Sequence, residues 1–268
     1  GTTSLYEREK QVIDVPARLS PGDSLLLELS YKGQIDERIC YLNVPDAEIA
    51  DTRERMYLAC RLGKRYSYLR KDFTLLIPEV LWYPTTVPPE NPGSPYDNSW
   101  DFTRYSLRVR NYGKNKVISQ GMRMKKGDQL VFRNESPLPG LTLNIGDYVT
   151  RQLIVDSVTY ELHVWRKHAS LLKLLNDRLL PSSVREGTSA RSIIRGARHV
   201  AEISAGNKYP YKRFQLVETP LDFTSYFRNE MKCSGFVQPE VLYFPERGFG
   251  TKIFSSEVEV AVHLLLFR

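Results

Sequence analysis

The chain has 268 residues, of which 41% are hydrophobic and 26% are charged, a composition that excludes an intrinsically disordered protein. This length exceeds one small domain and predicts two domains, each with a core of its own. The net charge of +7 permits attraction to an anionic partner, although the 38 basic residues are scattered among 31 acidic ones.

The first part of the chain has the pattern of short strands separated by turns. Alternating leucines predict a strand at 24–31, and the Lys32-Gly33 turn predicts a hairpin with a second strand at 34–44. Further strands are predicted at 56–69, 73–78, 105–110, 116–124 and 129–133. A regular series of short strands is typical of a β-sandwich.

A proline-rich segment at 84–99 interrupts these strands. Proline has no main-chain N–H to donate, so we expect this segment to form a surface loop. Four aromatic residues surround it: Trp82, Tyr83, Tyr96 and Trp100. Aromatic rings on a loop can stack on sugars or anchor a protein partner, and they can equally pack over the edge of the sandwich. A carbohydrate- or protein-binding sandwich module is therefore one interpretation of the chain.

The second part of the chain is predicted to mix helices and strands. Apolar stripes predict a helix at 169–180, ended by Pro181, and a helix at 189–204, ended by Gly206. Strands are predicted from alternating or buried apolar runs at 141–145, 149–165, 214–218 and 240–244.

The predicted fold class is therefore β-rich α+β. An N-terminal antiparallel β-sandwich or saddle is predicted at 1–143, and a smaller α/β domain at 144–268. The boundary is placed where the pattern changes, near Gly140 to Gly146.

The sequence carries no complete metal or nucleophile motif. Its four histidines are His163, His168, His199 and His263, and none of them belongs to a His-Glu-x-x-His motif. His263 has the spacing of a degenerate zinc motif, with Leu264 at the position of the general base and Phe267 at the position of the second ligand. A plain apolar strand is the alternative for this segment. We predict no catalytic residue, no metal site and no cofactor within the chain, because a catalytic zinc needs three protein ligands.

The three cysteines, Cys40, Cys60 and Cys233, have no zinc-knuckle spacing. A disulfide between Cys40 and Cys60 can form if the compartment is oxidising, although the spacing does not require it. No run reaches the roughly 18 apolar residues that a membrane span needs.

Basic and aromatic residues alternate at 64–71, a composition that grooves for single-stranded nucleic acid also use. Ordinary solvated strands show the same alternation, so we predict no nucleic-acid partner.

Several short motifs together resemble a known family. They are IP at 77–78, LWYP at 81–84, GDY at 146–148, IVDSV at 154–158, YPYKRFQLVETPL at 209–221 and FVQPE at 236–240. In this order they resemble the gluzincin zinc aminopeptidases of the aminopeptidase N and leukotriene hydrolase type. The resemblance is strongest to the membrane-bound branch that is fused to ABC-type transporter permeases.

The resemblance implies a saddle domain followed by the beginning of a thermolysin-like domain. It places Gln238 and Glu240 in the loop that normally binds the substrate amine, although the usual Gly-Ala-Met-Glu-Asn reads FVQPE here. The interpretation that we favour is a non-catalytic, extracytoplasmic (periplasmic) domain of a membrane protein that binds peptides or partner proteins. The alternative is the N-terminal fragment of an active zinc aminopeptidase, with zinc as cofactor and a His-Glu-x-x-His beyond Arg268.

Overall fold

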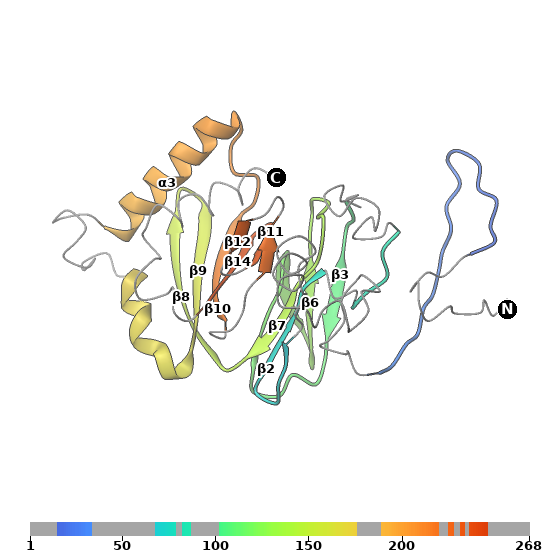
Figure 1. Ribbon diagram of the computed structural model, residues 1–268, viewed down its shortest axis with the longest axis horizontal. Helices are drawn as coiled ribbons and strands as arrows, with labels where there is room; N and C mark the ends of the chain where they lie inside the picture. Colours follow the sequence, from blue (N-terminus) through green and yellow to red (C-terminus); the bar gives the residue numbers. More distant parts are fainter. Residues whose placement is uncertain are drawn as a thin grey trace, which may run out of the picture.

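The computed structural model describes residues 15–33, 68–78, 82–86, 102–175, 189–219, 225–227, 231–233 and 236–245. The fold is β-rich α+β, as the sequence predicted: within these residues, antiparallel and mixed sheets dominate and helices are few. Figure 1 shows the sheets side by side, with the helices gathered at one end of the body.

Two antiparallel sheets are built from residues 68–146. The four-stranded sheet has the order β1-β2-β7-β4, with β1 (Tyr68–Leu69), β2 (Phe73–Leu76), β7 (Leu143–Gly146) and β4 (Lys116–Ile118). The three-stranded sheet has the order β3-β6-β5, with β3 (Ser106–Val109), β6 (Gln129–Arg133) and β5 (Met122–Lys126).

The five-stranded sheet belongs to the second part. Its order is β13-β14-β10-β9-β8, with β13 (Phe236–Gln238), β14 (Val241–Pro245), β10 (Arg213–Thr219), β9 (Val158–Trp165) and β8 (Tyr148–Val155). The three central strands are parallel, and both edge strands pair antiparallel with their neighbours. A separate pair joins β11 (Ser225–Phe227) to β12 (Met231–Cys233).

The predicted run at 149–165 is a hairpin of β8 and β9. It turns at Asp156 and Ser157, whose φ angles are 46° and 68°. Positive φ at both central residues is the signature of a type I′ turn, which matches the right-handed twist of paired strands.

The predicted strand at 116–124 is split between two sheets. The chain leaves the four-stranded sheet after Ile118 and enters the three-stranded sheet at Met122. Gly121 makes this bend with φ 82°, and a Cβ there would lie 2.4 Å from the carbonyl oxygen of Arg133. Only glycine fits this position, because a side chain meets the backbone whatever its rotamer.

Of the two predicted helices, the second is confirmed. Helix α3 (Ala190–Ala205) begins after Ser189, whose side chain accepts a hydrogen bond from Ser192 N, and ends at the left-handed Gly206. Gly206 is the glycine stop that the sequence predicted, whereas Ser189, predicted as the first helical residue, is the polar N-cap.

The first predicted helix was wrong in type and start. Instead of an α-helix at 169–180, a 3₁₀ segment, η2 (Arg166–Leu175), follows β9 directly and is irregular at His168. Arg166 N donates to Asp147 O, and its guanidinium binds the Asp147 carboxylate, so the turn begins three residues earlier than predicted. Residues 176–180 lie outside the described part of the chain.

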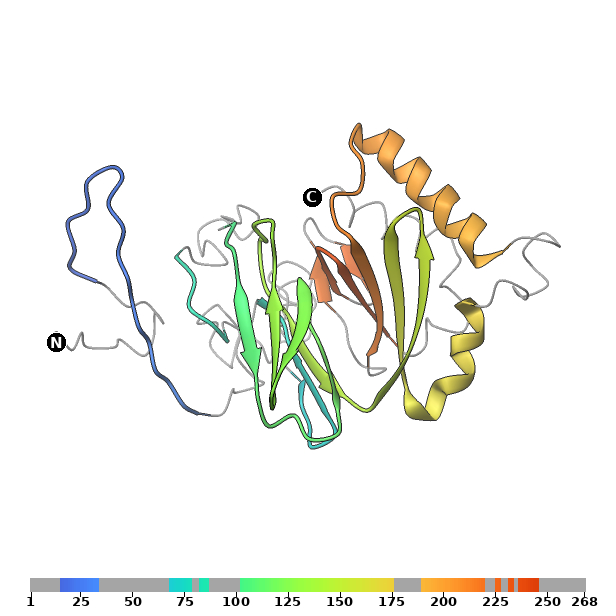
Figure 2. The same cartoon turned by 180° about the vertical axis from the view of Figure 1, so that it is seen from behind.

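The predicted strand at 24–31 was also wrong. Every residue of 15–33 is exposed and forms no strand, and Figures 1 and 2 show this segment in blue, standing apart from the sheets. A strand needs a ladder partner, and the predicted partner at 34–44 lies outside the described residues. Tyr31 contacts the body through a hydrogen bond from its hydroxyl to Trp82 O, 2.9 Å long. Most of the predicted strand at 56–69 and of the proline-rich loop also lies outside the described residues.

One apolar core is shared by the three large sheets. It contains Leu75 of the four-stranded sheet, Phe132 of the three-stranded sheet, and Val217 and Tyr243 of the five-stranded sheet. The opposite face of the five-stranded sheet packs on η2 and α3. The predicted domain boundary at 143/144 falls within β7 and stays a prediction. No helix among the described residues is long and apolar enough to cross a membrane.

Because the core is shared, we expect Leu75→Ala to destabilise both parts of the chain together. Leu75 is fully buried, so its truncation should lower the free energy of unfolding by about 2–5 kcal/mol. Urea unfolding followed by tryptophan fluorescence and far-UV circular dichroism would measure this. Leu26→Ala is the matched control, since Leu26 is 94% exposed and should change stability by less than about 0.5 kcal/mol. Two separate transitions, only one of them shifted by Leu75→Ala, would contradict a shared core.

Candidate functional site

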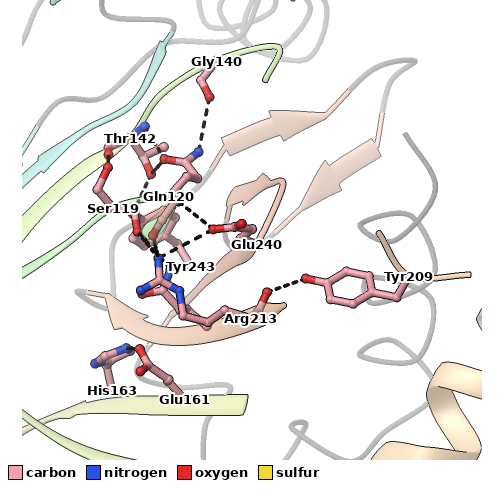
Figure 3. Close-up of polar contacts among 12 residues, drawn as sticks. Ser119, Gln120, Gly140, Thr142, Glu161, His163, Tyr209, Arg213, Glu240 and Tyr243 are labelled. Atoms are coloured by element: carbon pink, nitrogen blue, oxygen red, sulfur yellow. Dashed lines mark hydrogen bonds and ion pairs between the residues drawn. The ribbon is translucent and has the colours of Figure 1, made fainter. Parts of the chain in front are cut away.

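Buried polar side chains form a layer between the four-stranded and the five-stranded sheet, which we call the polar layer (Figure 3). Its members come from the bend after β4, from the segment around β7, and from the inner face of β9, β10, β13 and β14. They are Ser119, Gln120, Thr142, Glu161, His163, Arg213, Gln215, Gln238, Glu240 and Tyr243. Buried polar groups cost free energy unless they are hydrogen-bonded, so their partners determine how the two sheets meet.

Arg213 binds the bend between β4 and β5. Its Nη2 lies 3.0 Å from Ser119 O and also donates to Gly121 O. The same nitrogen lies 3.6 Å from Glu240 Oε2. A guanidinium presents several donors in a fixed plane, which allows one side chain to bridge two carbonyls and a carboxylate.

Glu240 approaches the same bend from the turn between β13 and β14. Gly121 N donates to Glu240 Oε2 over 2.7 Å. Pro239 precedes Glu240, whose φ is 67°, and a proline followed by a positive φ is the pattern of a type II turn. Burial raises the pKa of the Glu240 carboxyl above its usual value, against the opposing effects of Arg213 and of the Gly121 N–H.

A second group of hydrogen bonds lies beside this contact. Gln120 Nε2 donates to Gly140 O over 3.3 Å, and its Oε1 accepts from Thr142 N and Thr142 Oγ1 at 2.9 and 3.0 Å. Thr142 Oγ1 lies 2.8 Å from the hydroxyl of Tyr243, whose pKa is raised by burial. Both Gln120 atoms are therefore satisfied by partners in the segment before β7.

Tyr209, the first residue of the YPY motif, supports Arg213 from outside the layer. Its hydroxyl donates to Arg213 O over 2.7 Å, and burial raises its pKa well above the usual value. Its ring contacts Phe214 edge to face, with centroids 6.5 Å apart. The motif thus positions the beginning of β10.

The two site residues that the resemblance indicated lie at this layer. Glu240 is committed to Gly121 and Arg213, and its side chain is 12% exposed. Gln238 is 6% exposed, and its Oε1 is buried without a hydrogen-bond partner in the described part of the chain. A Cβ on Gly140 would lie 3.4 Å from that oxygen. Binding of a substrate amine by Gln238 and Glu240 stays a prediction.

Sequence reasoning missed Arg213, Gln120 and Thr142. Each is a polar residue in or beside an apolar strand, and the only signal is an inward position where alternation predicts an apolar side chain. Their side-chain partners are at least 20 residues away in the chain, so no local spacing reveals them.

His163 belongs to a buried hydrogen-bonded chain rather than to a group of metal ligands. Its Nε2 lies 3.1 Å from Glu161 Oε2 and its Nδ1 lies 2.9 Å from Thr150 Oγ1. Lys116 Nζ donates to Thr150 Oγ1. The chain is satisfied when neutral His163 donates to Glu161 and accepts from Thr150. Burial lowers the pKa of His163. Burial also raises the pKa of Glu161, but the contacts with His163, Arg213 and Gln152 together outweigh burial and lower this carboxyl pKa to about 2.

The other histidines lie apart from this chain. His168 Nδ1 contacts the buried Glu218 carboxylate, His199 is exposed on α3, and His263 lies outside the described residues, as do Cys40 and Cys60. In the ranges that the structure describes, no three residues of the His, Cys, Asp and Glu types are grouped to hold a metal.

The aromatic pair beside the proline-rich loop is engaged with the body. Trp82 Nε1 donates to Leu141 O over 3.3 Å, and Leu141 N donates to Tyr83 OH over 3.0 Å. The Trp82 and Tyr83 rings pack edge to face with their centroids 4.9 Å apart, and the centroids of the Tyr83 and Tyr105 rings are 5.5 Å apart. These contacts support packing over the sandwich edge for Trp82 and Tyr83, whereas 87–101 lies outside the described residues.

No protein-family model and no curated protein matches the sequence. Solved structures with a similar arrangement include an M1 zinc metallopeptidase from Deinococcus radiodurans, with a TM-score of 0.43 and 12% identity over 68% of this chain and 38% of that chain. They also include leukotriene A4 hydrolase from Saccharomyces cerevisiae, with a TM-score of 0.43 and 10% identity over 60% of this chain and 22% of that chain. Aminopeptidase A from Legionella pneumophila has a TM-score of 0.42 and 12% identity over 66% of this chain and 19% of that chain.

The chain therefore spans 19% to 38% of the length of these three proteins. The family resemblance of the sequence stays a prediction.

We expect acidification to destabilise the protein through His163. Its folded pKa is below the usual value of about 6.5, so the unfolded chain binds the proton first and stability falls as the pH drops below about 6.5. One such group contributes up to about 1.4 kcal/mol per pH unit. Urea unfolding between pH 7 and pH 5 should show a smaller pH slope for His163→Gln. The exposed His199→Gln should keep the slope of the unmodified protein, and an unchanged slope in His163→Gln would refute the assignment.

Proposed function

We propose that the chain is a peptidase-like module that binds an extended peptide segment at the edge of the five-stranded sheet formed by β13. The observation that carries this proposal is the register of β13 on β14. Gln238 pairs with Val241 on either side of a two-residue turn, and Val237 pairs with Leu242. Since the pair that flanks a two-residue turn exchanges both hydrogen bonds, the N–H and C=O of Val237 point away from β14.

No described strand pairs with this outer edge of β13. An edge with outward N–H and C=O groups accepts an extended peptide as an added strand, and main-chain hydrogen bonds then supply affinity. Glu240 contributes by holding the β13–β14 turn on Gly121, which positions the edge. Peptide or protein partners are thus the class that this edge favours.

The sequence adds finer elements to the proposal. The chain lacks a His-Glu-x-x-His motif, which supports binding without hydrolysis by these 268 residues. The resemblance to the permease-fused branch supports a membrane-bound parent protein with this module on the extracytoplasmic side. If the parent carries a zincin helix beyond Arg268, the same edge would hold the substrate of a zinc aminopeptidase. Zinc content and aminopeptidase activity of the full-length protein separate these two functions.

Val237→Pro is the direct test of the β13 edge. Proline removes the outward N–H and leaves the β13–β14 hydrogen bonds in place, because the bonded pairs are at Phe236 and Gln238. Losing one hydrogen bond should cost about 1 kcal/mol, or roughly fivefold in affinity. Fluorescence anisotropy with a pool of labelled ten-residue peptides would measure it, with Val237→Ala as the control that keeps the N–H. Equal affinities of Val237→Pro and Val237→Ala would refute binding at this edge.

The same assay tests the predicted amine contact of Glu240. We expect Glu240→Gln to weaken the binding of peptides with free N-termini and of peptides with acetylated N-termini by the same factor. The reason is that the carboxylate is already bound to Gly121 and Arg213. A loss confined to free N-termini would instead assign amine binding to Glu240.

A further inference from the structure

The two faces of the three-stranded sheet differ in composition. Leu107, Val109, Leu130 and Phe132 point to the shared core. Successive side chains of a strand alternate between faces, so the residues between them point outward. The outward set, which we call the basic face, contains Arg108, Arg110, Lys126 and Arg133 together with Ser106, Met122, Met124 and Gln129. Val131, at the centre of this face, has the same orientation but is only 2% exposed.

The cations of the basic face lack acidic partners in the part of the chain that the structure describes. All four are exposed, and β3, β5 and β6 contain no Asp or Glu. Asp128, in the turn between β5 and β6, is the carboxylate nearest to Lys126 in the chain, and it forms no ion pair with these cations in the described residues. Arg110 is oriented by Gln129, whose Oε1 accepts from its Nη2 and Nε at 2.7 and 3.3 Å once the amide is placed to satisfy both groups. The nearest acidic residue after β6 is Glu135, which pairs with Lys212 at 3.8 Å.

Such a face is costly to keep without an anionic partner. Cations that share one face repel each other, and strands usually place charges of both signs on a solvated face. On the core face, β3 and β6 follow the ordinary apolar pattern, and the edge strand β5 places Arg123 and Lys125 there.

From this geometry we infer that the basic face is a docking surface for an extended acidic polypeptide segment. Arg108 lies in β3 and Arg110 is the residue directly after its end, two positions on, which in an extended chain is a spacing of about 6.6 Å. Alternate side chains of an extended peptide have the same spacing, so Asp or Glu residues at alternate positions meet successive guanidinium groups. A guanidinium binds a carboxylate through two parallel hydrogen bonds, which favours this ligand over a diffuse anion.

The composition of the face supports a peptide over single-stranded nucleic acid. Single-strand binding surfaces stack bases on aromatic side chains, and the outward residues of β3, β5 and β6 include no aromatic residue. Met122, 55% exposed, instead offers apolar contact to the stem of a neighbouring side chain.

This surface is separate from the edge proposed above. The basic face belongs to the three-stranded sheet, whereas β13 belongs to the five-stranded sheet. Figure 2 shows the three-stranded sheet on the side of the body that is away from α3. The inference therefore does not depend on peptide binding at β13, and Val237→Pro should leave it unchanged.

The test measures anisotropy of a labelled peptide of alternating Glu and Thr with the full chain, at about 0.15 M salt, where long-range attraction is screened. The matched variants are Arg108→Glu and Lys125→Glu. Both reverse one exposed charge of the same sheet, but Lys125 points to the opposite face. We expect Arg108→Glu to weaken binding at least tenfold and Lys125→Glu to weaken it less than twofold. Arg133→Ser, in the central strand, should weaken binding as well.

Three control probes complete the experiment. They are a peptide of the same composition in which all Glu precede all Thr, oligothymidylate, and vesicles with about one-third phosphatidylserine. Tighter binding of the alternating peptide than of all three supports the inference. Equal or tighter binding of vesicles or oligothymidylate would overturn it in favour of a membrane or nucleic-acid surface. Equal losses for Arg108→Glu and Lys125→Glu, or no binding of the alternating peptide, would overturn it as well.

Discussion

The contact of Arg213 and Glu240 with the bend at Ser119 to Gly121 is the constraint on which the arrangement of the sheets depends. A buried guanidinium or carboxylate without partners costs several kcal/mol, so neither charge can lie between two sheets unless its donors and acceptors are met. Here the partners are main-chain groups whose positions the bend fixes. The four-stranded and five-stranded sheets can therefore meet in one arrangement at this end, and the apolar core fills the space beside it.

Hydrogen bonds and apolar contacts contribute differently to the packing of the two sheets. The apolar contacts of Leu75, Val217 and Tyr243 supply the larger favourable free energy, but they have no direction and tolerate small shifts. The hydrogen bonds of Gln120 and Thr142 have narrow geometry and are lost when the sheets slide. We interpret the polar layer as the part that specifies the relative position of the sheets.

Two kinds of recognition surface arise from this framework. The edge of β13 offers main-chain groups, which bind any extended segment whatever its side chains. The basic face offers guanidinium groups on a rigid strand spacing, which select for charge. Because both surfaces are held by sheets that share one core, a protein partner that used both would meet them at a fixed distance. Specificity would then come from the side chains at one surface and affinity from the main chain at the other.

The sequence by itself determined the elements whose signals are local. Helix α3 with its end at Gly206, the β-rich α+β class and most strand positions follow from periodicity and turn residues that lie next to each other in the chain. Only the tertiary structure decided the split at 119–121, the loss of the strand at 24–31 and the pairing of Arg213 with Gly121, 92 residues away. These features depend on partners distant in sequence, because a strand exists only with a ladder neighbour and a buried charge only with its counter-group, and neither leaves a local pattern.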